Sequence, residues 1–168
     1  MVYEKSGSST VQTRLPEGEP CGIVSETVVE ELKAKLSSDD PKIAEEGIRK
    51  SLLLIQLYPE DFLEELLASL ASAAWKHENF QRNLEESLAD IAKNKPTYIP
   101  VDTLQKLSEN KLWYPRWLTL WILNNMSYRH PNLVPTELLE KLTKDEKWWN
   151  REFAEEILNR VWRSRVKY

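Results

Sequence analysis

The sequence predicts an all-α protein of eight helices paired into four hairpins, and three observations predict this fold class. From Ser25 onward, apolar residues recur at spacings of three and four, the period of an amphipathic helix. All four glycines lie at or before Gly47, so the later chain lacks the residue that tight β-hairpins prefer. Two segments 35 residues apart also match closely, which indicates a repeated helical unit.

The chain begins with a stretch that differs from the rest in composition. Residues 1–22 combine Ser, Gly, Thr, Pro and charged residues with few apolar ones. Because burial of so few apolar groups cannot offset the entropy of ordering, we expect a flexible tail followed by one helical domain over 23–168. Ser25 is the predicted N-cap of the first helix. The segment SSDDP at 37–41 ends that helix and starts the next, since proline is accepted in a first helical turn.

The later helices are separated by proline-containing or polar breaks. These breaks are Tyr58-Pro59, KHEN at 76–79, KPTYIP at 95–100 and HPNLVP at 130–135. Between and after them the apolar spacing predicts helices from Pro59, from Phe80, near Leu104, over Lys111–Arg129, around Leu138 and from Lys147 to about Arg163. No strand is expected.

The repeat is the strongest signal in the chain. KPTYIPVDTLQKL at 95–107 and HPNLVPTELLEKL at 130–142 superpose at an offset of 35, with both prolines and both leucines matched. The second helix of each unit carries one arginine, at intervals of 33, 34 and 35: Arg49, Arg82, Arg116 and Arg151. The predicted units are 25–58, 59–95, 96–130 and 131–164.

This pattern resembles the HEAT-repeat family, in which a turn with Asp or Pro precedes a second helix with an early Arg. Asp39-Asp40-Pro41 before Arg49 and Asp145 before Arg151 carry the resemblance. It implies a right-handed α-solenoid whose second helices line the concave side. KHEN and Glu109-Asn110 depart from the motif because they lack the Asp.

Two features of the arginine row lead to further expectations. Pro115, directly before Arg116, predicts a helix that starts late or bends. The row itself could bind phosphates, but we favour a structural role in which each guanidinium binds turn carboxylates and carbonyls between neighbouring repeats. The net charge of −4 supports this preference, because it provides no overall positive field.

Bulk composition excludes several classes of protein. Cys21 is the only cysteine, and His77 and His130 lie far apart, so we expect no disulfide framework, metal site or cofactor. No apolar run approaches the roughly 18 residues of a membrane span, and the N-terminus lacks a signal-peptide core. We therefore expect a cytoplasmic protein without membrane contact. No catalytic motif is present, and an enzyme would need groups that only the fold brings together.

Equivalent positions in repeats face equivalent environments, which identifies a candidate site. Positions two and six after each arginine are predicted to lie in the core. Positions one and five after are mostly polar and are expected to be exposed, yet the third repeat has Trp117 and Trp121 there. Two indoles four residues apart share one helical face, and this pair is the sharpest functional clue.

Polar residues at matching positions extend this face on either side of the two indoles. They are Asn83, Ser87 and Asp90 in the second repeat, Asn124 in the third, and Glu152, Glu156 and Asn159 in the fourth. Aromatic faces beside carboxylates suit a basic protein or peptide segment or a partner helix. The alternative is that the indoles are simply buried. Trp113 and Tyr114 recur as Trp148 and Trp149 and are predicted to pack between hairpins.

The main functional prediction is therefore a non-enzymatic protein-interaction scaffold. Its alternative is a nucleic-acid-binding or base-repair solenoid that uses the arginine row with aromatic stacking, which the acidic balance disfavours. A homodimer contact through the Trp-rich face is the third prediction.

Overall fold

The computed structural model describes residues 26–166, with side chains described up to Arg165. The predicted tail 1–22, Cys21 and the predicted Ser25 cap lie outside these residues. The described chain contains eight α-helices and no strand, which confirms the predicted all-α class. The helices are α1 (Glu26–Leu36), α2 (Pro41–Leu57), α3 (Pro59–Lys76), α4 (Gln81–Asn94), α5 (Val101–Ser108), α6 (Trp113–Arg129), α7 (Thr136–Leu142) and α8 (Trp148–Val166).

Three short 3-10 helices that the sequence pattern did not predict lie in the breaks. They are η2 (Glu78–Phe80), η3 (Pro96–Tyr98) and η4 (Pro131–Leu133). Two of them begin with a proline, which fixes φ and has no backbone N–H to leave unpaired.

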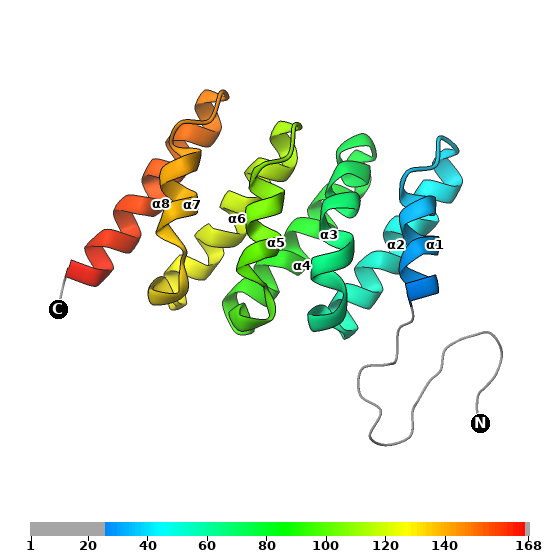
Figure 1. Cartoon of the computed structure of the whole chain (residues 1–168), viewed down its shortest axis with the longest axis horizontal. Helices are drawn as coiled ribbons and strands as arrows, with labels where there is room; N and C mark the ends of the chain where they lie inside the picture. Colours follow the sequence, from blue (N-terminus) through cyan, green and yellow to red (C-terminus); the bar gives the residue numbers. More distant parts are fainter. Residues whose placement is uncertain (1–25, 167–168) are drawn as a thin grey trace, which may run out of the picture.

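Consecutive helices pair into four hairpins that lie side by side along the long axis of the molecule (Figure 1). We number the pairs α1–α2, α3–α4, α5–α6 and α7–α8 as hairpins 1 to 4. The first helices contact one another in succession, from α1 to α7, and the second helices do the same, from α2 to α8. The two layers enclose one continuous apolar core.

Local sequence explains where the helices begin. The Asp40 carboxylate accepts the Lys42 backbone N–H at 3.0 Å, so it caps α2, and Pro41 follows in the first turn. Helix α6 begins at Trp113, so Pro115 lies within its first turn, where an N–H would have no intrahelical acceptor. The helix therefore begins two residues before the proline rather than after it.

The core positions predicted from the repeat are confirmed with one exception. The eight residues at two and six after the arginines are Ser51, Leu84, Leu118, Phe153, Ile55, Leu88, Ile122 and Ile157, and all but Phe153 are fully buried. Phe153 is half-buried because its ring packs against Trp117 at the edge of the core. The periodic pattern thus identifies the helical faces that carry the core.

Candidate functional site

A cluster of aromatic rings dominates α6 and the ends of its neighbours. Trp75, Tyr114, Trp117 and Trp121 form a series of stacked rings with centroids 5.5 to 6.0 Å apart and interplanar angles of 28°, 12° and 15°. Trp113 lies edge-on to Trp75 at 5.0 Å and to Trp149 at 5.3 Å. Trp113 thus contacts hairpins 2 and 4, which confirms the prediction that this ring packs between hairpins.

The two indoles of the predicted site are half-buried, an outcome between the two alternatives. The Trp117 ring stacks on the rings of Tyr114 and Trp121, and its centroid lies 6.1 Å from that of Phe153. Since a cation requires an open ring face, these contacts limit the room for cation–π binding at Trp117. The pair offers a ligand a partly exposed apolar surface.

Two hydrogen bonds to Glu85 fix the aromatic series to α4. The Trp121 Nε1–H donates to the Glu85 backbone oxygen at 2.8 Å, and the Tyr114 hydroxyl donates to the Glu85 carboxylate at 2.8 Å. Burial, together with this carboxylate, raises the pKa of Tyr114 above its ordinary value. Tyr114 therefore stays protonated and remains a donor throughout the neutral range.

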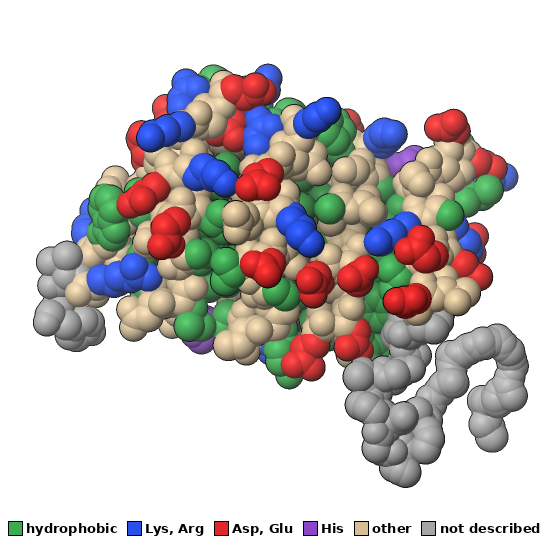
Figure 2. All heavy atoms as spheres, in the orientation of Figure 1, with side chains coloured by type: hydrophobic (Ala, Val, Ile, Leu, Met, Phe, Trp, Pro, Cys, Tyr) green, Lys and Arg blue, Asp and Glu red, His purple; other side chains and the backbone are tan. Residues whose placement is uncertain are grey.

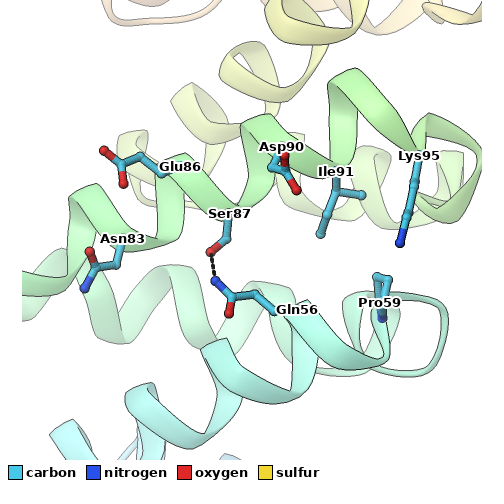
Figure 3. Close-up of a pocket in the computed structure, with 8 residues that line it drawn as sticks. All are labelled: Gln56, Pro59, Asn83, Glu86, Ser87, Asp90, Ile91 and Lys95. Carbon is cyan, nitrogen blue, oxygen red and sulfur yellow. Dashed lines mark hydrogen bonds between the residues drawn. The ribbon is translucent and has the colours of Figure 1, made fainter.

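On the other side of α4, the structure forms a pocket of about 370 Å³ between α2 and α4. Its eight lining residues are Gln56, Pro59, Asn83, Glu86, Ser87, Asp90, Ile91 and Lys95. Asn83, Ser87 and Asp90 were all predicted from the repeat, and the fold brings them to one cavity. Figure 3 shows Lys95 and Pro59 at one end of this α2–α4 pocket and Asn83 and Glu86 toward the other.

Acceptor oxygens in the α2–α4 pocket remain open to a ligand. Asp90 Oδ1 accepts the Asn94 amide at 2.9 Å, and Glu86 Oε2 accepts Arg82 Nε at 3.0 Å. The second oxygen of each carboxylate has no hydrogen-bond partner among residues 26–165. The Asn83 side chain is exposed and likewise has no hydrogen-bond partner among residues 26–165. Two carboxylates and one amide therefore present acceptors to a cationic group.

Ser87 corrects one expectation, because it is buried rather than exposed. Gln56 on α2 covers it, with its Nε2 donating to the Ser87 hydroxyl at 3.0 Å (Figure 3). Because the Ser87 side chain is small, α2 can pack closely against α4 at this position. The polar residue type therefore did not predict exposure here. Ser87 lies at the floor of the pocket.

The remaining predicted site residues lie apart from this pocket. Asn124 is half-buried and accepts Arg160 Nη1 at 2.7 Å. Glu152, Glu156 and Asn159 are exposed on α8 and do not line the pocket. The structure therefore groups the α4 residues in one cavity and the two indoles in one stack, and leaves the α8 residues separate.

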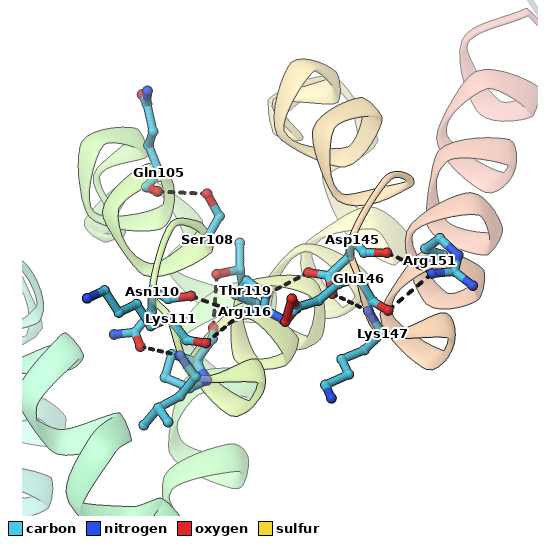
Figure 4. A network of polar contacts seen from close by, with 12 residues as sticks. Gln105, Ser108, Asn110, Lys111, Arg116, Thr119, Asp145, Glu146, Lys147 and Arg151 are labelled. Atoms are coloured by element: carbon cyan, nitrogen blue, oxygen red, sulfur yellow. Dashed lines mark hydrogen bonds and ion pairs between the residues drawn. The ribbon is translucent and has the colours of Figure 1, made fainter.

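One of the four arginines, Arg116, serves the structural role between repeats that the sequence favoured. The Arg116 side chain is 10% exposed. Its Nη1 donates to the backbone oxygens of Asn110 and Lys111. Its Nε and Nη2 donate to the Asp145 carboxylate at 2.6 Å and 3.1 Å (Figure 4). Burial alone would raise the pKa of Asp145, but bonds from Arg116 and the Lys147 N–H hold it below its ordinary value.

Arg151 repeats the turn contacts of Arg116 at an offset of 35. Its Nη1 donates to the backbone oxygens of Asp145 at 2.9 Å and Glu146 at 3.3 Å (Figure 4). Arg49 and Arg82 are exposed and do not follow this pattern: Arg49 lies over the Phe80 ring and Arg82 pairs with Glu86. The predicted contact between neighbouring repeats therefore holds for Arg116 only, and Arg151 shares with it only the bonds to the turn before its own helix.

Basic residues near the C-terminus are also engaged within the protein. Arg160 stacks on Tyr128 at 4.2 Å, and Arg165 donates to the backbone oxygens of Pro131 and Val134. Figure 2 shows acidic and basic side chains interspersed over the face that it displays. These observations place several basic groups in structural contacts rather than in one continuous positive surface.

The described chain offers neither a metal site nor a membrane-spanning helix. Between residues 26 and 166, no group of three or more His, Cys, Asp or Glu side chains is placed to hold a metal ion. None of the helices in the same range combines the length and apolar character needed to cross a membrane.

Sequence reasoning missed several residues of the site. Gln56, Glu86 and Lys95 line the pocket, and Glu85 anchors the aromatic series, yet none was singled out. Glu86 lies three residues after Asn83 and four before Asp90 on one helix, so helical spacing alone could have added it. Gln56 comes from the preceding repeat and required the packing of α2 on α4.

The described chain is thus all-α, with a polar pocket lined by two carboxylates and one lysine on one side of α4 and an aromatic stack on the other. Comparison of the chain with protein-family models, with curated proteins and with solved structures finds no match in any of the three.

Proposed function

We propose that this chain is a non-enzymatic interaction scaffold, built as a HEAT-like α-solenoid, that binds a basic peptide segment along its second helices. A Lys or Arg side chain of the partner enters the α2–α4 pocket and pairs with Asp90 and Glu86. Apolar parts of the partner lie against Trp117 and Trp121. The observation that carries the proposal is that Asn83, Ser87 and Asp90 line one pocket. Asp90 and Glu86 each keep one carboxylate oxygen without a partner among residues 26–165.

Several contacts support the pocket as the point of recognition. Gln56 and Ser87 are already bonded to each other, so the floor is organised before a ligand arrives. Arg129 donates to Asn94 at 2.9 Å, and Asn94 donates to Asp90, so α6 helps to orient the Asp90 carboxylate. Pro59 and Ile91 provide apolar contact for the stem of a long basic side chain.

Binding of defined peptides to the isotope-labelled protein tests the proposal. A short peptide of alternating lysine and glycine should shift the backbone amide signals of Asn83, Ser87 and Asp90, and a glutamate-glycine peptide of equal length should not. Asp90→Asn should weaken binding by about fivefold, because a partly exposed ion pair contributes about 1 kcal/mol. Glu137→Gln, an exposed carboxylate on α7, is the matched control. Equal binding of the two peptides would contradict the proposal.

The nucleic-acid alternative draws less support from the contacts. Arg116 is buried and committed to Asp145, so it cannot reach a phosphate without giving up its partner. Arg49 and Arg82 remain exposed. Binding of single-stranded DNA at low salt that falls steeply with added salt would favour this alternative, since counterion release gives that dependence.

A further inference from the structure

The interface between hairpins 3 and 4 shows how one hairpin of this chain holds the next. Helix α6 presents Trp113 and Arg116 toward hairpin 4. Trp113 packs edge-on against the Trp149 ring. Nε and Nη2 of Arg116 donate hydrogen bonds to the Asp145 carboxylate. This carboxylate also accepts the Lys147 N–H at 2.8 Å through Oδ1, in the turn that leads into α8. The interface thus joins an outward Trp–Arg pair to an Asp of the turn before α8.

Helix α8 repeats the outward half of this interface at the C-terminal end of the row. Trp148 and Arg151 stand 35 residues after Trp113 and Arg116. Arg151 uses Nη1 for its own turn, as Arg116 does, but its Nε and Nη2 have no partner among residues 26–165. Trp148 is 58% exposed, and Trp162, farther along the helix, is 46% exposed. We call Trp148, Arg151 and Trp162 the α8 end face.

Hairpin 1 carries the complementary half at the opposite end of the row. Asp40 lies directly before α2 and caps it through Oδ1, in the turn between the two helices of hairpin 1, and its Oδ2 has no partner in the described chain. Helix α2 also exposes Ile43 at 40% and Leu57 at 58%. We call Asp40, Ile43 and Leu57 the α2 end face.

Asp40 lies nine residues before Arg49, whereas Asp145 lies six residues before Arg151, so the two carboxylates lie in corresponding turns but not at the same repeat position. A guanidinium with unused donors thus lies at one end of the row, and a carboxylate with an unused oxygen lies at the other, among residues 26–165.

We propose that the α8 end face docks on the α2 end face of a second copy of this chain. Arg151 binds Asp40 of the next copy as Arg116 binds Asp145, while the exposed indoles cover Ile43 and Leu57. A symmetric contact between two α8 end faces would not bring Asp40 to Arg151, because Asp40 lies at the opposite end of the row. The contact is therefore head-to-tail, and such a contact adds copies in a row unless it closes into a ring.

A complementation experiment with the full chain tests this proposal. Molar mass measured by sedimentation from about 1 µM to about 1 mM, a range that covers weak complexes, should rise beyond the dimer for the unmodified chain. Trp148→Glu and Leu57→Glu each remove one face, so each variant alone should stay monomeric. Their equimolar mixture should form a dimer, because one intact pair of faces remains. Trp162→Glu replaces Trp148→Glu if that variant loses its helical circular dichroism.

Three outcomes of this experiment would each overturn head-to-tail docking. A monomeric unmodified chain over the whole range overturns the proposal. Self-association of Leu57→Glu to a dimer overturns it too, since that result requires contact between like faces. A mixture that stays monomeric while the unmodified chain associates also contradicts it.

The predicted ion pair has a separate test that leaves the fold intact. Asp40→Asn keeps the helix cap, because Asn caps as well as Asp, and removes only the charge. It should weaken association by about tenfold or more, as loss of one partner of an interfacial charge pair does. Asp39→Asn, which changes the neighbouring exposed carboxylate, is the matched control. Equal association of the two variants, or a larger loss with Asp39→Asn, would exclude the Arg151–Asp40 pair.

Discussion

The interfaces on the two sides of hairpin 3 use different chemistry for the same purpose. Toward hairpin 2, Trp75 packs on Trp113 and Tyr114, and Glu85 receives the Tyr114 hydroxyl and the Trp121 indole. Toward hairpin 4, the buried Arg116–Asp145 pair stands beside the Trp113–Trp149 contact. The position of Asp145 is taken by Asn110 in hairpin 3. The arginine of the preceding hairpin, Arg82, pairs with Glu86 on its own helix.

A buried arginine contact between hairpins therefore forms where the next hairpin supplies a carboxylate. Asn110 caps its turn as Asp145 does, with its side-chain oxygen accepting the Leu112 N–H at 2.9 Å. A neutral amide suffices for the cap, but it cannot hold a buried guanidinium. The hairpin 2–3 interface therefore depends on rings and on Glu85, and the hairpin 3–4 interface depends on charge as well.

Asp145→Ala should produce the largest change. It leaves the Arg116 charge buried without its anion, which typically costs about 3 to 5 kcal/mol in the free energy of unfolding. Chemical denaturation followed by circular dichroism measures this loss. Glu109→Gln, which breaks an exposed pair with Lys141, should change stability by about 1 kcal/mol or less. Similar losses for the two variants would show that burial does not distinguish the pairs.

Acid should selectively weaken the same interface. Because the pKa of Asp145 is lower in the folded protein than its ordinary 3.8, its contribution is present above pH 3.8 and is lost as the pH falls through the folded-state pKa. The stability difference between the natural chain and Asp145→Asn should therefore shrink below pH 3.8. Denaturation at a series of acidic pH values checks this, and a difference that grows with acid would contradict it.

Trp113→Ala should weaken both interfaces at once. Its ring lies between Trp75 and Trp149, so the truncation removes contacts to hairpins 2 and 4. For a half-buried indole we expect a loss of about 2 to 4 kcal/mol in the free energy of unfolding. Trp148→Ala, which removes an exposed indole one helical repeat later, is the control for a monomeric sample and should cost far less.

Tyr114→Phe should affect only the hairpin 2–3 interface. It removes the bond to the Glu85 carboxylate and keeps the stacked ring, so we expect a loss of about 1.5 kcal/mol. Denaturation measures the stability change. Amide exchange should rise in α4 and not at the start of α8, and a rise in α8 alone would refute the assignment.

Asn110→Asp should give the smallest effect and tests whether the two interfaces can be made alike. The new carboxylate at position 110 in hairpin 3 would compete with Glu86 for Arg82 of hairpin 2, as Asp145 binds Arg116 one hairpin later. Because Arg82 is exposed, we expect a gain of about 0.5 kcal/mol at most. A loss larger than the experimental error would show that Asn110 is required as the neutral amide.

The sequence predicted the helices and the core positions because both follow from a local apolar period. It also placed Asn83, Ser87 and Asp90 on one face, since equivalent repeat positions share an environment. It could not place Gln56 over Ser87, because that contact joins residues 31 apart on two helices. Nor could it show that stacking on Tyr114 would occupy Trp117, since ring orientation depends on side-chain packing.

The Asp145 carboxylate also has a consequence for the way in which the chain opens. One oxygen accepts both the Lys147 N–H, in the turn that leads into α8, and Arg116 Nη2, so opening of that turn and separation of hairpins 3 and 4 are coupled. The two hairpins should then exchange their amide protons as one cooperative unit. The boundary of that unit lies toward α4, which has no side-chain cap among the residues that the structure describes.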